Sequence, residues 1–399
     1  MGASTEAMIS SKTPATQEGR EVAVSPELAW LSQALRGEAR WPPIGIDEAP
    51  TRQLLEVAAR HGVRELLFAA LKPTPVWQQV PEPLRDALTR EHHKAQAREL
   101  YLEQEIADDL NALFEHDIDT LLLKGTALAH LLYPSPALRP RCDVDLLLRD
   151  KQTANRAWQL LKQRGYKRQP AVSGDFVSHE YCCARATTPH AGIVLDIHWR
   201  LSNSNYFAQK FSFDQLFAGR TAVQPLGPNA FALSLPDALL HALIHRLWSL
   251  GAGEPDRLLW VCDFDLFCRR LTPEQWSQFI ALVAQTDLGP TCADGLRRAQ
   301  TLLNTPLPSD LFEHLAPRHK HANRQLQLGR PGWRKALTDA QSLPSWSQRL
   351  RLIREYLFPD RDYMQQRFGV TGVTSLAVAY ALRASGGIRR HLKPQPRTL

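Results

Sequence analysis

The chain has 399 residues, of which 44% are hydrophobic, so it can bury a sizeable core without disulfide or metal staples. Its six cysteines form no Cys-x-x-Cys pair, a pattern typical of neither a zinc ribbon nor a disulfide framework, and this indicates a reduced, cytoplasmic setting. No run of about 18 apolar residues occurs, so we expect no membrane span. The net charge of +7 suits anionic ligands such as nucleotides or nucleic acid without choosing between them.

The N-terminal quarter of the chain predicts helices and no strand. Residues 1 to 24 are rich in Ser, Thr, Ala and Gln without apolar periodicity, so we expect them to be disordered. Apolar residues then recur at helical spacing, and a long helix is predicted from about Leu84 to His116. We therefore expect an N-terminal helical region over residues 25 to 117, whose apolar faces need a partner to be stable.

The apolar period changes at Ile118, where short buried strands begin to alternate with helices. The pattern predicts strands at 118–123, 142–148, 176–185 and 193–201, with helices over 124–133 and 151–165. This order predicts an α+β fold, in which a small mixed sheet is covered by helices. We place this core at residues 118 to 232.

Helical spacing returns at about Pro236 and continues for most of the remaining chain. Helices are predicted at about 255–270, 273–286, 289–303 and 345–357, and the Pro-rich, basic segment 306–331 reads as a loop. We expect a C-terminal helical domain over residues 233 to 345, followed by a helical and basic tail over residues 346 to 399.

Two aspartates share one face of the second predicted strand, in the sequence Cys142-Asp143-Val144-Asp145. Two carboxylates this close repel each other when both are ionised, and a hard divalent cation relieves that repulsion through oxygen ligands. An exposed acidic strand edge would have the same sequence, so the motif alone leaves both interpretations open.

A third carboxylate, Asp196, lies amid a strongly apolar predicted strand, where burial is costly unless the group is paired or bound to metal. If this strand neighbours the previous acidic one, Asp196 joins Asp143 and Asp145, and the three could hold two Mg²⁺ ions roughly 3.5–4 Å apart. We therefore predict Mg²⁺, or Mn²⁺, as the cofactor. His198 shares the face of Asp196, either beside a bound nucleotide or as a satisfied polar residue at the sheet rim.

A strand-to-helix turn with the sequence Lys124-Gly125-Thr126 precedes the acidic strand. Backbone N–H groups at the start of a helix bind anions, and a glycine there lets a phosphate approach the backbone. Thr126 adds a hydroxyl donor, and Lys124 adds a point charge. Arg139, in the following segment, is either a bidentate phosphate ligand or a solvated loop residue.

Together these segments resemble the nucleotidyltransferase superfamily that has the fold of DNA polymerase beta. Its members have a Gly-Gly or Gly-Ser turn, then an Asp-x-Asp/Glu strand, then a third Asp on a later strand. The stretches LLLKGTALAHLLYPSPALRPRCDVDLLL and VLDIHWRL look most like the uncharacterised bacterial nucleotidyltransferase family of this superfamily. They match its K-G-x-A-L turn, R-x-x-x-D-x-D-x-L strand and D-x-H-W strand, and the likeness covers about residues 54 to 265. The gap between turn and acidic strand is longer than the superfamily's usual one, as it is in that family.

The resemblance implies metal-dependent transfer of a nucleoside monophosphate from a nucleoside triphosphate to an acceptor hydroxyl, with release of pyrophosphate. It assigns metal binding and catalysis to Asp143, Asp145 and Asp196. It assigns nucleotide binding to five residues at or near the turn: Lys124, Gly125, Thr126, Arg139 and His198. The resemblance does not decide whether the acceptor is a small molecule, a sugar, a peptide or RNA. Three alternatives are a toxin-like enzyme acting on transfer RNA, a D-x-D glycosyltransferase, and a non-catalytic nucleotide-binding or scaffold protein.

Weaker signals lie outside these motifs. His241 and His245 share one face of a predicted helix but lack the glutamate of the zinc motif H-E-x-x-H, so we expect this helix to line the nucleotide cleft. A second D-x-D begins at Asp263 within a predicted helix, where residues two apart point away from each other, so pairing with a basic neighbour is favoured. His179 and Glu180, on the strand before Asp196, could face the site.

Overall fold

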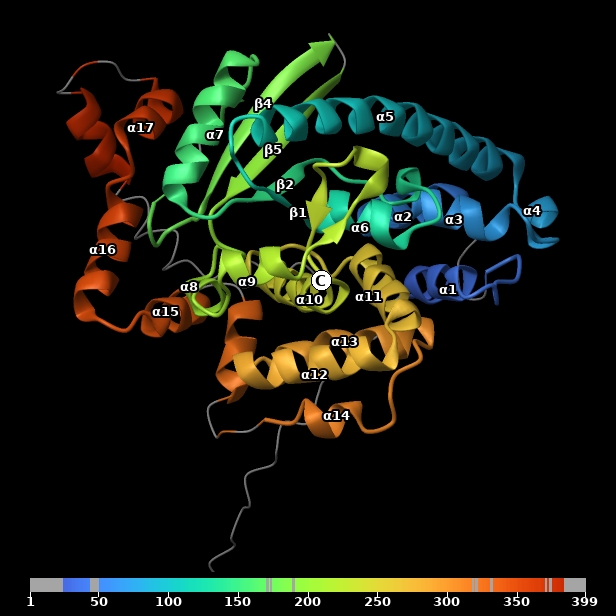
Figure 1. Cartoon of the computed structure of the whole chain (residues 1–399). Helices are drawn as coiled ribbons and strands as arrows, with labels where there is room; N and C mark the ends of the chain where they lie inside the picture. The colour runs from blue at the N-terminus through green and yellow to red at the C-terminus, as the bar shows by residue number, and fades with distance from the viewer. Residues whose placement is uncertain are drawn as a thin grey trace, which may run out of the picture.

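A seven-stranded mixed sheet forms the centre of the molecule (Figure 1). The structure is a computed structural model that describes residues 24–43, 50–169, 172, 174–188, 191–317, 319, 322–330, 333–369, 372 and 375–383. The strand order is β3-β4-β5-β2-β1-β7-β6. Their bounds are Leu121–Leu123 (β1), Val144–Leu147 (β2), Lys167–Arg168 (β3), Glu180–Thr188 (β4), Ala191–His198 (β5), Thr221–Ala222 (β6) and Phe231–Ala232 (β7). The α+β class predicted from the sequence is confirmed.

Both faces of the central strands are buried, and alternation decides which side chain reaches which face. Val144 and Leu195 belong to an apolar cluster beneath helices α5 and α7. Leu123 and Leu147 belong to a second cluster, on the face toward α10. Asp145 pairs with Leu123 across the β1–β2 ladder and therefore shares the face toward α10.

Helices α1 to α5 precede the sheet and span Pro26–Leu35, Pro50–His61, Arg64–Leu71, Val76–Gln79 and Glu82–Phe114. Those nearest the N-terminus share one apolar core with the C-terminal helices. The guanidinium of Arg36 donates to the carbonyl of Leu302 at 2.6 Å, and the backbone N–H of Leu258 donates to Nδ1 of His61 at 3.1 Å. Segments from the two ends of the sequence therefore stabilise each other on one side of the sheet.

The remaining helices connect the strands or follow them. Those within the sheet region are α6 (Lys124–Leu132), η1 (Pro136–Leu138), α7 (Lys151–Gln163), α8 (Asn205–Ala208), α9 (Phe213–Ala218) and η2 (Gln224–Leu226). Those after it are α10 (Leu235–Gly251), α11 (Leu258–Arg270), α12 (Pro273–Thr286), α13 (Gly289–Leu303), α14 (Leu311–His314), η3 (Ala322–Gly329), α15 (Trp333–Ser342), α16 (Trp346–Leu357) and α17 (Arg361–Phe368). Among the described helices, none combines the length and apolar character needed to cross a membrane.

Most of the elements that sequence periodicity does not predict are short. Strands β3, β6 and β7 have two residues each, too few to show alternation. The segment 306–331, predicted as a loop, contains α14 and η3, and the apolar spacing predicts neither α15 nor α17. The prediction of disorder over residues 1 to 24 lies, apart from Val24, outside the described residues, as does the end of the basic tail beyond residue 383.

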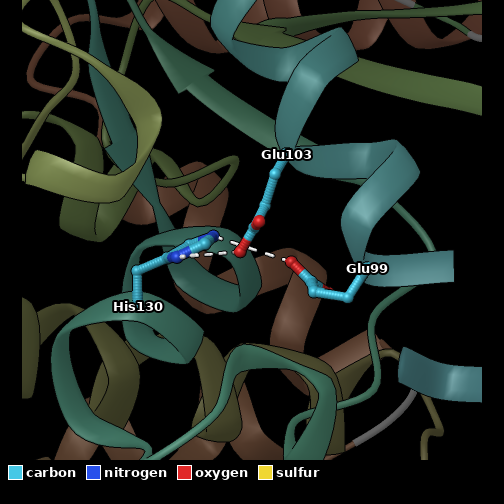
Figure 2. A group of neighbouring side chains, drawn as sticks. All are labelled: Glu99, Glu103 and His130. Carbon is cyan, nitrogen blue, oxygen red and sulfur yellow. Dashed lines mark ion pairs between the residues drawn. The ribbon is translucent and has the colours of Figure 1, made fainter. Parts of the chain in front are cut away.

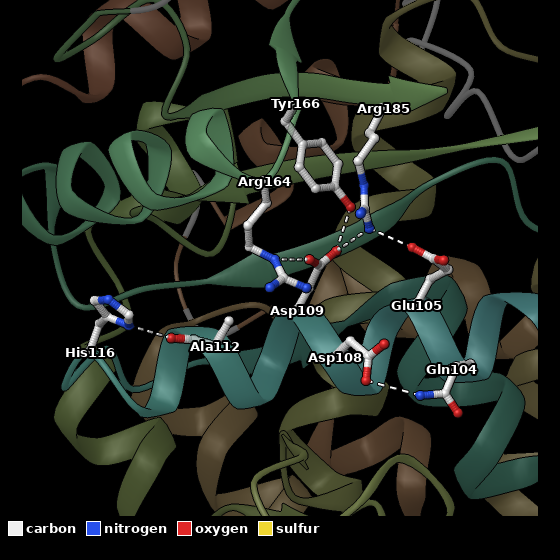
Figure 3. Close-up of polar contacts among 9 residues, drawn as sticks. All are labelled: Gln104, Glu105, Asp108, Asp109, Ala112, His116, Arg164, Tyr166 and Arg185. Atoms are coloured by element: carbon white, nitrogen blue, oxygen red, sulfur yellow. Dashed lines mark hydrogen bonds and ion pairs between the residues drawn. The ribbon is translucent and has the colours of Figure 1, made fainter. Parts of the chain in front are cut away.

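A buried carboxylate attaches the long helix α5 to the sheet (Figure 3). Asp109 is 2% exposed and accepts hydrogen bonds from Nε of Arg164 at 2.8 Å and from the hydroxyl of Tyr166. Burial, and then the charge of Asp109, raises the pKa of Tyr166, so this hydroxyl stays protonated and donates. Arg185 lies 3.5 Å from the same carboxylate and also pairs with Glu105. The helix that covers the sheet is thus fixed in place by polar contacts as well as by apolar packing.

We predict that Asp109→Ala lowers the free energy of unfolding by about 3 kcal/mol, because it leaves buried cationic and hydroxyl groups without their acceptor. Urea denaturation followed by circular dichroism measures this change. Asp108→Ala, on the exposed side of the same helical turn, is the matched control and should change stability by less than about 0.5 kcal/mol. Equal effects of the two substitutions would contradict this role of Asp109.

Candidate active site

Two of the predicted metal ligands stand opposite each other on neighbouring strands. Strand β5 runs parallel to β2, and Asp196 occupies the position paired with Asp145. Ligand atoms of Asp145, Asp196 and His198 all lie within 4.8 Å of one another. The expectation that a later strand brings the third aspartate beside the acidic strand is therefore met for Asp145.

The carboxylate of Asp145 is buried between two nitrogen donors. Nζ of Lys124 lies 2.6 Å from its Oδ1, and Nε2 of His198 lies 2.9 Å from the same atom. Burial alone would raise the pKa of Asp145, but the positive charge of Lys124 and the hydrogen bond from His198 hold it well below its usual range. Burial would likewise lower the pKa of Lys124, whereas the charges of Asp145 and Glu180 raise it. Asp145 is thus a permanent anion beside a permanent cation.

Asp196 lacks an equivalent cationic partner. Burial, followed by the negative charge of Asp145, raises the pKa of Asp196 to about 6. Its Oδ1 is buried and has no hydrogen-bond partner among the described residues. A buried carboxylate oxygen of this kind is costly unless a cation or donor reaches it.

Asp143 lies just before β2 and lines a cavity at the site. It lines this cavity together with Asp145 and Lys124 but does not belong to the cluster of Asp145, Asp196 and His198. Burial, and then the charge of Asp145, raises its pKa. The structure therefore brings the three aspartates to one region, with Asp145 in the middle.

The Lys-Gly-Thr turn joins β1 to α6 in a constrained geometry. Lys124 has a φ of 44°, a conformation that costs a residue with a side chain roughly 1–2 kcal/mol. A Cβ on Gly125 would lie 3.0 Å from Nη1 of Arg139 and 3.1 Å from Cβ of Arg141, so packing restricts this position. Thr126 is fully buried, and its hydroxyl accepts from Nε of Arg141 at 3.1 Å. Lys124 and Gly125 line the cavity, whereas Thr126 does not.

Arg139 is buried rather than a solvated loop residue. Its Nε and Nη2 donate to the two carboxylate oxygens of Asp263 at 2.8 and 2.7 Å. The hydroxyl of Tyr133 donates to the same carboxylate at 2.7 Å. The predicted pairing of Asp263 with a basic neighbour is confirmed. Arg139 also lines the cavity, so its predicted phosphate contact would have to coexist with this ion pair.

The cavity has a volume of about 550 Å³, within the range of small-molecule sites. Helix α10 lines it with His241 and His245, as expected from the sequence. Burial, and then the charge of Lys124, lowers the pKa of His241 to about 3, so this imidazole is neutral near pH 7. The lining also includes arginines that no sequence motif identified: Arg64, Arg98, Arg141 and Arg257.

Two further polar contacts complete the surroundings of the site. Glu180, paired with His198 across the β4–β5 ladder, has its Oε2 3.2 Å from Nδ1 of that histidine. His179 instead contacts the backbone carbonyls of Ser202 and Asp175.

Arg141 could have been found from the sequence. It precedes Asp143 by two residues, so alternation along an extended chain places the two side chains on the same face.

The sheet, its acidic strands and the adjoining turn are those of a nucleotidyltransferase-like α+β protein. Residues 47–304 match the model of the family described as "Uncharacterised nucleotidyltransferase", and the chain belongs to this family. A solved structure of an antigenic nucleotidyltransferase-like protein from Paracoccidioides brasiliensis is similar at 17% identity and a TM-score of 0.34, covering 53% of this chain and 96% of that chain. None of the curated proteins compared with the chain matches it. Family membership supports a general role in nucleotidyl transfer.

We predict that Asp196→Asn stabilises the metal-free protein at pH 8 by about 2 kcal/mol, because it removes a buried charge beside Asp145. The native state holds this proton more tightly than the unfolded chain, so wild-type stability falls as pH rises from the ordinary value of 3.8 to about 6. The gain should therefore vanish at pH 4. Denaturation in EDTA at both pH values tests this. A variant less stable than wild type at pH 8 would contradict the proposed repulsion.

We predict that Arg139→Ala and Asp263→Ala each lower the free energy of unfolding by about 3–5 kcal/mol, since either one leaves a buried charge unpaired. The double substitution should cost much less than the sum of the two. Arg269→Ala, which breaks an exposed ion pair with Asp265 on the same helix, is the control and should cost less than about 1 kcal/mol. Unchanged stability of Arg139→Ala together with lost nucleotide binding would instead make Arg139 a phosphate ligand.

Proposed function

We propose that this chain transfers a nucleoside monophosphate from a nucleoside triphosphate to an acceptor hydroxyl, with release of pyrophosphate and dependence on a divalent cation. The observation that carries the proposal is the in-register pair Asp145 and Asp196 on parallel strands, beside a cavity that begins at the turn of Lys124 and Gly125. The cavity is large enough for a nucleotide and is lined by several cationic side chains.

The donor set suits Mg²⁺ or Mn²⁺, which prefer carboxylate oxygens. Asp143, Asp145 and Asp196 would hold the metal, and the unpartnered Oδ1 of Asp196 supports this assignment. Lys124 and His198 both contact Oδ1 of Asp145, so a bound metal would have to share this carboxylate with them or replace them. When bound, a divalent metal supplies positive charge to the phosphate oxygens and stabilises the charge that develops during transfer.

The triphosphate would lie against the start of α6. The first backbone N–H groups of a helix have no intrahelical acceptor and are oriented to receive anionic oxygens. Lys124 adds a cationic donor, and Gly125 lines the cavity at this point. The neutral His241 lines the same cavity and adds an uncharged polar group to the bound nucleotide's surroundings.

The chemical step would use Asp196 as the proton acceptor. An ionised carboxylate within hydrogen-bond reach of the acceptor hydroxyl can accept its proton. The acceptor hydroxyl would lose its proton to this carboxylate as its oxygen attacks the α-phosphorus. The bond from the α-phosphorus to the bridging oxygen then breaks, and pyrophosphate leaves.

Four α-labelled nucleoside triphosphates, supplied with Mg²⁺ or Mn²⁺ and fractionated cell extract, test the activity. We expect label in an acceptor fraction, and we expect Asp143→Ala to reduce transfer at least about 100-fold while the half-buried position leaves the fold intact. Asp265→Ala, in the second D-x-D, is the matched control and should retain wild-type transfer.

Each alternative gives a distinct result in this assay. Label in RNA would identify a transfer-RNA-modifying type of enzyme. In a parallel incubation with sugar nucleotides, release of nucleoside diphosphate would identify a glycosyltransferase. Transfer at the wild-type rate by Asp143→Ala would rule out this site. Nucleotide binding without turnover in every fraction would favour a binding protein.

A further inference from the structure

A second cluster of potential metal ligands lies between helices α5 and α6, separate from the three aspartates (Figure 2). Glu99 and Glu103 are one helical turn apart on α5 and face the same side. His130, near the end of α6, faces both carboxylates. One ligand atom from each residue lies within 4.8 Å of the others.

The histidine in this cluster is buried and unsatisfied. The side chain of His130 is 1% exposed, and its Nε2 has no hydrogen-bond partner among the described residues. Nε2 lies 3.6 Å from Oε1 of Glu99, and Nδ1 lies 3.9 Å from Oε1 of Glu103. Both separations exceed a hydrogen bond, so a buried nitrogen points at carboxylates without being bonded to them.

These separations suit a shared metal better than direct contact. Ligand nitrogen and oxygen atoms bind a transition metal at about 2.0–2.2 Å, so two ligands of one tetrahedral ion lie roughly 3.4 Å apart. The 3.6 Å between Nε2 of His130 and Oε1 of Glu99 is close to that value. Nε2 of His130, buried and without a hydrogen-bond partner among the described residues, is the atom that would bind the metal.

Of the two carboxylates in the cluster, only that of Glu99 has a Lys or Arg partner among the described residues. Arg141 donates to both oxygens of Glu99, at 2.8 and 2.5 Å, and this neutralises one carboxylate. Glu103 has no ion pair with a Lys or Arg in the part of the chain that the structure describes, so an added cation would be its counter-charge.

We propose that Glu99, Glu103 and His130 bind a divalent transition metal of the Zn²⁺ or Mn²⁺ type, at a site distinct from the three aspartates. One imidazole with two carboxylates is a donor set for these ions, whereas Mg²⁺ selects oxygen ligands alone. The site does not depend on the proposed catalytic function. It is connected to the turn, because Arg141 contacts both Glu99 and the hydroxyl of Thr126.

Equilibrium dialysis of the metal-stripped full chain against Zn²⁺, and separately Mn²⁺, tests the site. We expect Glu103→Gln and His130→Ala each to lower affinity for one equivalent of metal at least about 10-fold. Saturating Zn²⁺ should also raise the melting temperature of the wild type, since a ligand that binds only the native state stabilises it, and should not raise that of Glu103→Gln.

Two control variants make the result specific. His116→Ala removes an exposed histidine just beyond the end of α5 and should retain the metal, and Asp145→Asn, which alters the other cluster, should retain the equivalent of Zn²⁺ that depends on Glu103 and His130. If His130→Ala fails to fold, the metal affinity of Glu103→Gln is the deciding measurement. Unchanged binding in a folded Glu103→Gln, or loss confined to Asp145→Asn, would overturn the proposal.

Discussion

Two carboxylates at paired positions on parallel, buried strands are the constraint around which the rest of this site is arranged. Asp145 is buried and Asp196 is half-buried there, so water screens their repulsion poorly and the protein or a ligand has to offset it. Lys124 and His198 both serve Asp145, which keeps it ionised, whereas Asp196 stays short of a counter-charge. The left-handed conformation of Lys124 is tolerated because that residue forms this ion pair at the point where the strand becomes a helix.

Two arginines pack against the turn that precedes α6. Arg139 and Arg141 lie against Gly125, and each is neutralised by a carboxylate on a helix outside the sheet. Asp263 of α11 pairs with the first, and Glu99 of α5 pairs with the second. These neighbours leave little room for a side chain at Gly125, a restriction that adds to the phosphate approach for which such turns are known.

Sequence reasoning located the acidic strands because alternation assigns side chains to faces, but it left the pairing of β2 with β5 as a condition, which the structure meets. It found the bounds of α12 and α13 because both are long and amphipathic. It could not find that Arg139 is engaged by a residue 124 positions later, since periodicity describes local structure and carries no information on distant partners. The clustering of Glu99 with His130 depends on the same kind of long-range packing.

The arginine pairs have a practical consequence for dissecting this polypeptide. The partner of one lies before the first strand in the chain, and the partner of the other lies after the last. A fragment trimmed to the strands and the helices between them would keep both guanidinium groups but lose both counter-ions, at about 3–5 kcal/mol each. That penalty is comparable to the whole stability of many domains. Minimal versions of this chain therefore have to retain α5 and α11, and the smallest stable unit is set by charge balance rather than by the extent of the sheet.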